Sequence, residues 1–590
     1  MRKLIYKYIA LGLIATIPFA SCTDFLEKVN PNEMSTDSFW KDNNDLEMGL
    51  TAVYNAFKHA QVLSVPEEYI RTDMCYPGFG RPNPSNGNAP YYLQTFNDAS
   101  AAPNNKWQAL YKGIFRANQV IEAYDDILPT LDTEEQQETA NLILAQARFL
   151  RGLFYFYLHN SFNNGSVILY ESVPVDEEDF YQPLQDESVI REFFMADLAF
   201  AYENLPTEWD AKLAGKVTKG AAAAVMGKAE LYAENYDAAA EHFKDVIDNY
   251  NYMLTENIND NFSEATEFNS ESILEIAYTL AYKSEINIWD DEQVSTGINY
   301  SFSPVGGWRA VLPSLSLTYA YRNDPVDKND PRNWLRDENN EIIEDGDGNP
   351  ELRKFSLRTS YSLALADDES LPYYQVLPGE AAQFNNQEYA YFRKHTNWET
   401  VTNERDIQPS QRSGINMRVI RLADVYLMYA EALIKGGTDA GRIDEALSYV
   451  NKVRHRSALQ LIGQPSSEFS SADFNGVDYT AESLMEHLMY VERPLELSVE
   501  GHAIRHLDMR RWGITKERFE ELALEEYGVE PYTIVNSEGK DLTRWSAILV
   551  RGVEGGGYSD FTEAAANYNA DAHAYWPIPN GEKTANPNIN

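Results

Sequence analysis

Cysteine is scarce in this sequence, whose 590 residues include only Cys22 and Cys75. If Cys22 is acylated, as argued below, Cys75 has no partner in the chain, so disulfide bonds do not hold this fold. A lone cysteine is usually a small buried apolar group, and we expect that role for Cys75. A reactive or ligand-contacting thiol is the alternative.

Positive charge is also in short supply. The chain has 49 Lys and Arg against 91 Asp and Glu, which gives a net charge of −42. Such a surface repels phosphate backbones and anionic lipids, so nucleic acid is a poor candidate partner. A neutral ligand would be indifferent to this charge.

The apolar run at the amino-terminal end is short. Residues 8–19 carry no charge and follow Arg2, Lys3 and Lys7, which is a signal-peptide layout. The run is about half of the roughly 20 apolar residues that a membrane-spanning helix needs. A permanent transmembrane anchor is therefore not expected from it.

Two small residues and a cysteine follow this run. Ala20 and Ser21 let a peptidase reach the backbone, and the Cys22 thiol can accept a diacylglycerol. The sequence thus predicts a signal peptide over 1–21 and a lipid anchor at Cys22. The alternative is ordinary signal cleavage beside an incidental cysteine, because Phe19 is bulkier than the aliphatic residue usual there.

Helical periodicity dominates much of the remaining chain. Apolar residues recur at helical spacing over 107–121, and a capping-box pattern from Thr133 to Gln136 starts a second, antiparallel helix. Further helix pairs are predicted over 220–247 and over 421–456. A chain of this length exceeds one compact core, so this pattern favours a solenoid of helix pairs with insertions.

One of these pairs matches tetratricopeptide spacing. Gly227, Ala239 and Phe243 occupy positions where small residues let two helices approach and an aromatic ring fills the gap to the next pair. One match is weak evidence, because Glu230 stands where that repeat usually has tyrosine. The stretch 284–416 differs: Pro, Gly, Asn and Asp interrupt it, aromatics are dense, and we expect a loop-rich cap there.

Aromatic residues are abundant, with 10 Trp, 38 Tyr and 26 Phe, and many are expected outside the core. They gather in two loop clusters, over 69–97 and over 289–308. A sugar ring could stack its C–H face on such rings while Asp, Asn and Arg bind its hydroxyls. The residues we predict to bind a glycan are Asp73, Tyr76, Arg81, Tyr91, Tyr92, Phe96, Asn97, Trp289, Tyr300 and Trp308. Alternatively, these rings pack the loops onto the scaffold.

Motifs for metal or phosphate chemistry are weak. His502 and His506 are four apart, but Ala503 replaces the glutamate that a zinc protease needs. The glycines at 552 and 555–557 lack the lysine of a phosphate loop. Asp345, Asp347 and Asn349 resemble part of a calcium loop, yet Pro350 favours a hairpin turn. No cofactor is predicted; calcium is conceivable without a specific motif.

Several strings near the carboxyl end resemble one family when read together. They are RLADVYLMYAEA at 421–432, NKVRHR at 451–456, ERPLELSVEG at 492–501, DMRRWG at 508–513 and YWPIP at 575–579. Residues 107–118 and 148–156 also fit. In this order the strings resemble the SusD/RagB family of surface nutrient-binding lipoproteins. Pro494, where an arginine is usual, and about two extra residues after Gly501 depart from the pattern.

The resemblance implies a mainly α fold with about four tetratricopeptide-like helix pairs and a loop-rich cap. The expected regions are a signal peptide (1–21), an N-terminal SusD-like region (22–283), the cap (284–416) and a C-terminal region completing the scaffold (417–590). The family strings themselves are expected to be structural, since Arg, Glu and Trp at helix junctions satisfy backbone groups and pack neighbouring turns.

The resemblance also implies a non-catalytic function at the cell surface. Such a protein binds an oligosaccharide or polysaccharide and passes it to a SusC-like TonB-dependent outer-membrane transporter. It is anchored to the outer membrane by lipid and faces outward. The alternatives are an oligopeptide cargo in the same family, a surface glycoside hydrolase, whose paired carboxylates sequence alone cannot locate, and a pure protein-interaction scaffold.

The lipid anchor is directly testable by labelling cells with radioactive palmitate. We expect the chain to take up label and Cys22→Ala to take up none, because the thiol is the acylated group. An unlabelled wild-type chain, or one recovered from the cytosol on fractionation, would contradict the lipoprotein hypothesis.

Overall fold

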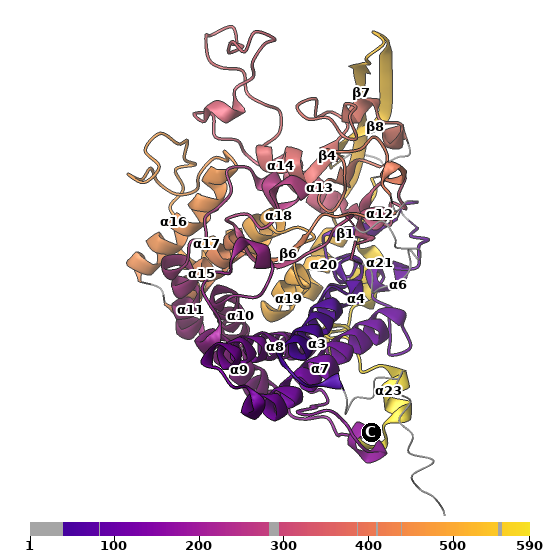
Figure 1. Ribbon diagram of the computed structural model, residues 1–590. Helices are drawn as coiled ribbons and strands as arrows, with labels where there is room; N and C mark the ends of the chain where they lie inside the picture. Colours follow the sequence, from indigo (N-terminus) through magenta and orange to yellow (C-terminus); the bar gives the residue numbers. More distant parts are fainter. Residues whose placement is uncertain are drawn as a thin grey trace, which may run out of the picture.

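The computed structural model describes residues 39–78, 80–81, 83–281, 294–385, 388–408, 411–437, 439–552 and 557–589. Cys22, Phe79, Trp289 and most of the glycine-rich loop therefore lie outside the described residues. Within them the fold is mainly helical, with short strands (Figure 1). No described helix has both the length and the apolar character needed to cross a membrane.

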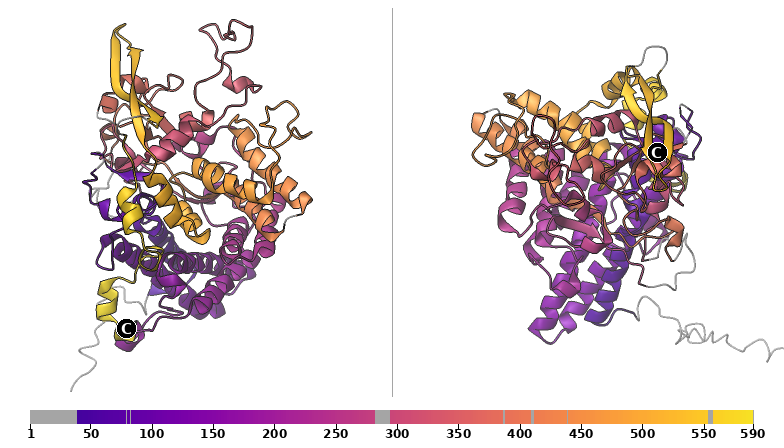
Figure 2. Two further views of the ribbon diagram at one scale, coloured as in Figure 1. Left: turned by 180° about the vertical axis from the view of Figure 1, so that it is seen from behind. Right: turned by 90° about the horizontal axis from the view of Figure 1, so that it is seen from above.

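Among the described residues, eight longer helices form the scaffold and pack in chain order, each against the next. Two further views show them stacked along one side of the molecule (Figure 2). They form four pairs, as expected for a tetratricopeptide-like scaffold: α3 (Asn43–Phe57) with α7 (Ala101–Ile127), α8 (Glu134–Ser161) with α9 (Glu187–Asn204), α10 (Lys219–Tyr232) with α11 (Tyr236–Asn249), and α15 (Leu422–Gly436) with α16 (Ala440–Arg456).

Local sequence determines where these helices begin and how closely they pack. The predicted capping box is present: the Gln136 N–H donates to Thr133 Oγ1 (3.2 Å), and the Thr133 N–H donates to Gln136 Oε1 (3.1 Å). A Cβ at Gly227 would lie 2.7 Å from Phe243 Cε1, so glycine is required for this approach of α10 and α11. The close approach of the two helices at Gly227, expected from the repeat spacing, is confirmed, and Phe243 packs against this glycine within the same pair.

Shorter helices complete the chain. Those before and in the cap are α4 (Ala60–Leu63), α5 (Val65–Ile70), α6 (Ala89–Tyr92), α12 (Ile298–Phe302), α13 (Leu315–Arg322) and α14 (Leu357–Ser362). Those near the carboxyl end are α17 (Ala481–His487), α18 (Arg493–Glu496), α19 (Ile504–Arg511), α20 (Thr515–Ala523), α21 (Thr562–Asn567), α22 (Ala570–His573) and α23 (Asn580–Ala585).

The strands described form antiparallel pairs, two of which join segments far apart in sequence. These two are β1 (Cys75–Pro77) with β3 (Val311–Pro313), and β2 (Ser272–Ile276) with β6 (Met417–Arg421). Within the expected cap, β4 (Leu363–Leu365) pairs with β5 (Ala390–Phe392). The long hairpin of β7 (Tyr527–Val535) and β8 (Asp541–Arg551) rises beside the cap (Figure 1). On β1, Cys75 is buried and unbonded, as predicted, and burial raises the pKa of its thiol well above the usual range.

A buried ionic network holds the cap segments to the scaffold. Arg421 contacts three carboxylates, those of Glu271 (2.6 Å), Glu496 (2.7 Å) and Glu500 (2.6 Å). The members are five cations and five carboxylates: Arg358, Lys394, Arg421, Arg454 and Arg456, with Glu271, Asp324, Glu492, Glu496 and Glu500. All ten side chains are buried, so each depends on its partners for the solvation it has lost.

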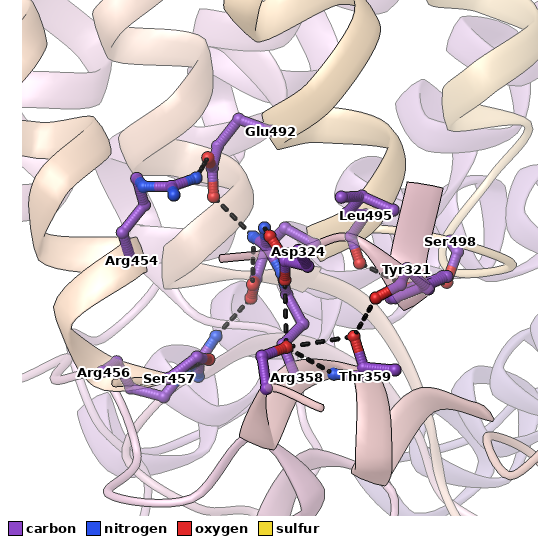
Figure 3. Close-up of polar contacts among 12 residues, drawn as sticks. Tyr321, Asp324, Arg358, Thr359, Arg454, Arg456, Ser457, Glu492, Leu495 and Ser498 are labelled. Atoms are coloured by element: carbon purple, nitrogen blue, oxygen red, sulfur yellow. Dashed lines mark hydrogen bonds and ion pairs between the residues drawn. The ribbon is translucent and has the colours of Figure 1, made fainter. Parts of the chain in front are cut away.

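Figure 3 shows the part of this network where the cap meets the scaffold. Arg358 of α14 donates to Asp324 (3.0 Å) and to Glu492 (2.5 Å), and Arg454 of α16 donates to the other oxygen of Glu492 (2.7 Å). Several of the strings noted in the sequence supply this network, since Arg421, Arg454, Arg456, Glu492, Glu496 and Glu500 all belong to them. Their expected structural role is confirmed.

Replacing Glu271 by glutamine tests the network. Burial alone would raise the pKa of this carboxyl, but Arg456 and Arg421 lower it to about 2, from an ordinary value of 4.5. Its charge therefore stabilises the fold above about pH 4.5, and that contribution is lost as pH falls through about 2. We expect Glu271→Gln to cost about 3–5 kcal/mol at pH 7 and to make stability less dependent on pH between 4.5 and 2.

Chemical unfolding at several pH values measures both effects. Glu538→Gln is the matched control, because the Glu538 side chain is 67% exposed and pairs with the exposed Lys540. Wild-type stability in the Glu271 variant at pH 7 would show that the network does not hold the cap.

Candidate functional site

The two aromatic clusters predicted from the sequence are brought together by the β1–β3 pair. Tyr76 lies opposite Leu312 in that pair, and the Gly78 N–H extends it by donating to the Ala310 carbonyl (2.9 Å). The Asn86 side-chain amide donates to the same carbonyl (3.1 Å). Residues 75–78 and Asn86 therefore lie against the loop that carries Trp308. Trp289 of the second cluster lies outside the described residues.

Trp308 is the exposed ring at this junction, with 50% of its surface accessible. Its ring meets that of buried Tyr300 edge to face, with centroids 5.7 Å apart and planes at 84°. The loop is tied back to α12, because the Trp308 N–H donates to the Tyr300 carbonyl (2.6 Å) and the Ala310 N–H to the Ser301 carbonyl (2.7 Å). The exposed ring thus stands on a fixed support.

Glycine makes this support possible. A Cβ at Gly307 would lie 2.5 Å from the Ser303 carbonyl oxygen and 2.8 Å from that of Tyr300, closer than real contacts allow. The preceding Gly306 has φ +84°, which glycine adopts without strain. The Gly-Gly pair therefore lets the chain pass close over α12 immediately before it presents Trp308.

Polar side chains contact the loop at Gly306, two residues before Trp308. Arg405 is exposed, and its Nε donates to the Gly306 carbonyl (3.2 Å), which places the guanidinium beside the loop. The Asn403 side chain accepts from the Arg405 N–H (3.0 Å). The flat apolar ring of Trp308 can stack on the face of a sugar. The amide and guanidinium groups that contact this loop can bind the sugar's hydroxyls.

Buried Glu404 holds the segment that carries Asn403 and Arg405. Its Oε2 accepts from the side-chain amides of Asn299 in α12 (2.8 Å) and Asn397 (2.8 Å), and its Oε1 accepts from the Tyr374 hydroxyl (2.5 Å). One carboxylate therefore joins α12 to the segment that carries Arg405. The relative positions of Trp308 and Arg405 depend on this carboxylate.

Arg81 plays a similar part on the other side of the junction. Its guanidinium donates to Glu388 (2.6 Å), to the Pro313 carbonyl (2.8 Å) and to Asp560 (3.3 Å), and it lies 4.3 Å from the centre of the Tyr76 ring. Burial raises the pKa of the Glu388 carboxyl to about 7, and Arg81 opposes that shift. Arg81 thus links the segments that carry Pro313, Glu388 and Asp560.

Most other predicted binding residues pack inside the molecule. Asp73 pairs with Arg505 (2.6 Å) and Arg518 (3.1 Å), which lower its pKa to about 2 although burial acts the other way. The Tyr91 and Tyr92 hydroxyls accept from the backbone N–H groups of Ala102 and Phe561. The binding role proposed for these residues is untested, but their contacts are those of side chains that pack loops onto the scaffold.

Of the remaining predicted binding residues, three are buried and Asn97 is exposed. Tyr76, Phe96 and Tyr300 are buried, and the Phe96 ring packs on Trp576, with centroids 4.8 Å apart. Asn97 is exposed, and its side chain accepts from the Ala99 N–H in a local turn. Arg405 and Asn403 were not predicted; the Gly306–Gly307 pair before Trp308 was a signal for this loop.

The weaker motifs have structural roles in the part of the chain that is described. His502 stacks on Tyr157, with ring centroids 3.8 Å apart, and burial lowers the pKa of this histidine well below its usual range. The Asp345 carboxylate accepts from the N–H groups of Asp347 and Asn349 in a hairpin turn, which confirms that interpretation. Nowhere in the described ranges do three or more His, Cys, Asp or Glu side chains form a group that could hold a metal ion.

The sequence model of the SusD family matches residues 270–590, and a second, described as starch-binding associating with outer membrane, matches residues 24–231. The chain belongs to the SusD family. A SusD-like protein, P25, of Formosa agariphila is 25% identical over 85% of this chain and 89% of its own length.

Solved structures of SusD proteins share the fold. A SusD superfamily protein from Bacteroides vulgatus superimposes with a TM-score of 0.68 at 24% identity, covering 94% of this chain and 99% of its own. A laminarin-binding SusD-like protein gives 0.64 at 22% identity (93% and 99% covered). A structure with xylogluco-oligosaccharide gives 0.62 at 19% identity (92% and 98% covered). The helical, tetratricopeptide-like SusD fold predicted from the sequence is confirmed.

The Gly307 support can be tested by one added methyl group. Gly307→Ala places a Cβ against two carbonyl oxygens, and overpacking of this kind costs about 1–3 kcal/mol. We expect a lower unfolding temperature and faster hydrogen exchange over residues 298–310. Gly346→Ala is the control, because no atom lies within 4 Å of a Cβ there. If both alanine variants behave alike, the loop does not depend on the close approach over α12.

Proposed function

We propose that this SusD-family chain is a non-catalytic lipoprotein of the outer membrane that captures a neutral oligosaccharide at the cell surface. The observation that carries the proposal is Trp308, a half-exposed tryptophan on a loop that backbone hydrogen bonds tie to α12 and that Arg405 contacts at Gly306. Two structural relatives support it, since one binds laminarin and one was solved with a xylogluco-oligosaccharide.

The carboxylates near the loop support a binding role over hydrolysis. A glycosidase needs two carboxyl groups facing each other across a cleft, one to donate a proton and one to attack or activate water. Glu404 and Glu388 are 0% and 2% exposed, and both bind protein side chains. Neither is placed to reach a sugar bound on Trp308, so we assign no catalytic residue and propose no cofactor.

Delivery to a transporter completes the proposed role. We infer that the lipid on Cys22 anchors the chain to the outer membrane, facing outward, and that captured sugar passes to a SusC-like TonB-dependent transporter. By analogy with aromatic pairs, each stacked ring contributes about 0.5–1.5 kcal/mol. Two or three such rings together with hydrogen bonds, less the entropy lost when the glycan is immobilised, give roughly micromolar to millimolar affinity. Weak binding suits a protein that must release its cargo.

Calorimetry of the purified full chain tests the proposal directly. We expect binding of a laminarin oligosaccharide or a xylogluco-oligosaccharide, and Trp308→Ala should weaken it about 2- to 12-fold, because one stacking contact is lost. The unfolding temperature should change little, since half of the ring is already in water.

Trp545→Ala is the matched control. Trp545 is 77% exposed on the β7–β8 hairpin, so the same chemical change is made on another surface. Equal losses in both variants would argue against a site at Trp308. Binding of peptides, with no binding of any glycan tested, would overturn the proposed function.

A further inference from the structure

A cavity of about 460 Å³ lies on the helical scaffold. Its walls come from the turn before α10 (207–218), from the end of α11 (249–252) and from the segment 268–275 before and along β2. In Figure 1 α10 and α11 appear at the left of the molecule, and α12, next to the Trp308 loop, at the right. A volume of this size is in the range of small-molecule sites.

Four aromatic side chains line this cavity: Trp209, Tyr250, Tyr252 and Phe268. Protein groups already bind the polar ends of the three rings that have one. The Tyr250 hydroxyl donates to Asp245 Oδ2 (3.3 Å). Trp209 Nε1 donates to the Val217 carbonyl (2.8 Å), and the Tyr252 hydroxyl lies 3.2 Å from Thr218 Oγ1. None of the four rings is fully buried, so apolar surface is available at the cavity.

Phe268 is the unusual member of this set. Its backbone has φ +52°, which is a rare conformation for a bulky residue and costs free energy. Burial does not offset the cost, because 41% of the side chain is exposed. The ring is held over Gly215, where an added Cβ would lie 3.0 Å from Phe268 Cε1. Strain that keeps an exposed ring at the edge of a cavity is a feature of ligand-binding residues.

Charge at the cavity argues against an anionic ligand. Three charged residues line it, Glu208, Lys216 and Glu275. Lys216 pairs with Glu47 (2.7 Å), and Glu275 pairs with Arg418 (3.0 Å), which leaves Glu208 at the exposed rim. An anionic ligand would meet no unpaired cation among these lining residues. Exposed Thr207 and Asn251 at the rim can bind hydroxyl groups.

We propose that this cavity is a second binding site for a neutral sugar of one or two rings, on the scaffold and separate from the Trp308 loop. The inference rests on the proposed function, because the cargo is taken to be the same glycan. Two sites on one chain would let a long polysaccharide be held at two points, which raises its overall affinity without tighter single contacts.

Phe268→Gly separates ligand binding from folding. Glycine adopts φ +52° without strain, so this variant should unfold at the wild-type temperature or above it, while the ring is lost. Saturation-transfer NMR with a laminarin oligosaccharide and a xylogluco-oligosaccharide measures sugar binding to full-chain variants. We expect Trp308→Ala to keep weak binding, and the added Phe268→Gly change to reduce it about fivefold or more.

Phe180→Ala, combined with Trp308→Ala, is the control, because Phe180 is an exposed ring (50%) that does not line this cavity. Residual binding that survives Phe268→Gly, or that is absent in Trp308→Ala while the wild type binds, overturns the second site and leaves the proposed function standing. A wild-type chain that binds neither sugar overturns both proposals.

Discussion

The balanced set of ten buried charges is the constraint on which the rest of the structure depends. Five cations and five carboxylates are removed from water together, so deleting any one of them leaves a buried charge of the opposite sign in excess. The network joins α14 of the cap to α16 of the scaffold, to the short helix α18 and to Glu271, the residue before β2. It therefore fixes where the cap lies relative to the helix pairs.

The surface that we propose to bind sugar is held in place because the cap is attached to the scaffold. The β1–β3 pair brings residues 75–78 to the Trp308 loop, and the buried side chains of Glu404 and Arg81 hold the segments on either side. Trp308 can then remain half exposed, because backbone hydrogen bonds to Tyr300 and Ser301 hold its loop on α12. A fixed ring loses little conformational entropy when a ligand stacks on it.

The scaffold could be predicted from sequence because its signals are local. The capping box at Thr133 and the Gly227–Phe243 spacing depend on residues close in the chain, and both appear in the structure. The direction of side chains in the loops could not be predicted in this way. Asp73 pairs with Arg505, and the Tyr92 hydroxyl bonds to the Phe561 N–H, so both are buried by segments more than 400 residues away. Likewise, the backbone strain at Phe268 has no sequence signature.

A crystal structure of the full chain with a bound laminarin oligosaccharide or xylogluco-oligosaccharide is the most direct measurement of whether the exposed loop ring binds sugar. We expect electron density for a sugar ring stacked on Trp308, with a sugar hydroxyl hydrogen-bonded to Arg405 or Asn403. Sugar bound elsewhere, with the Trp308 ring still open to solvent, would contradict this expectation.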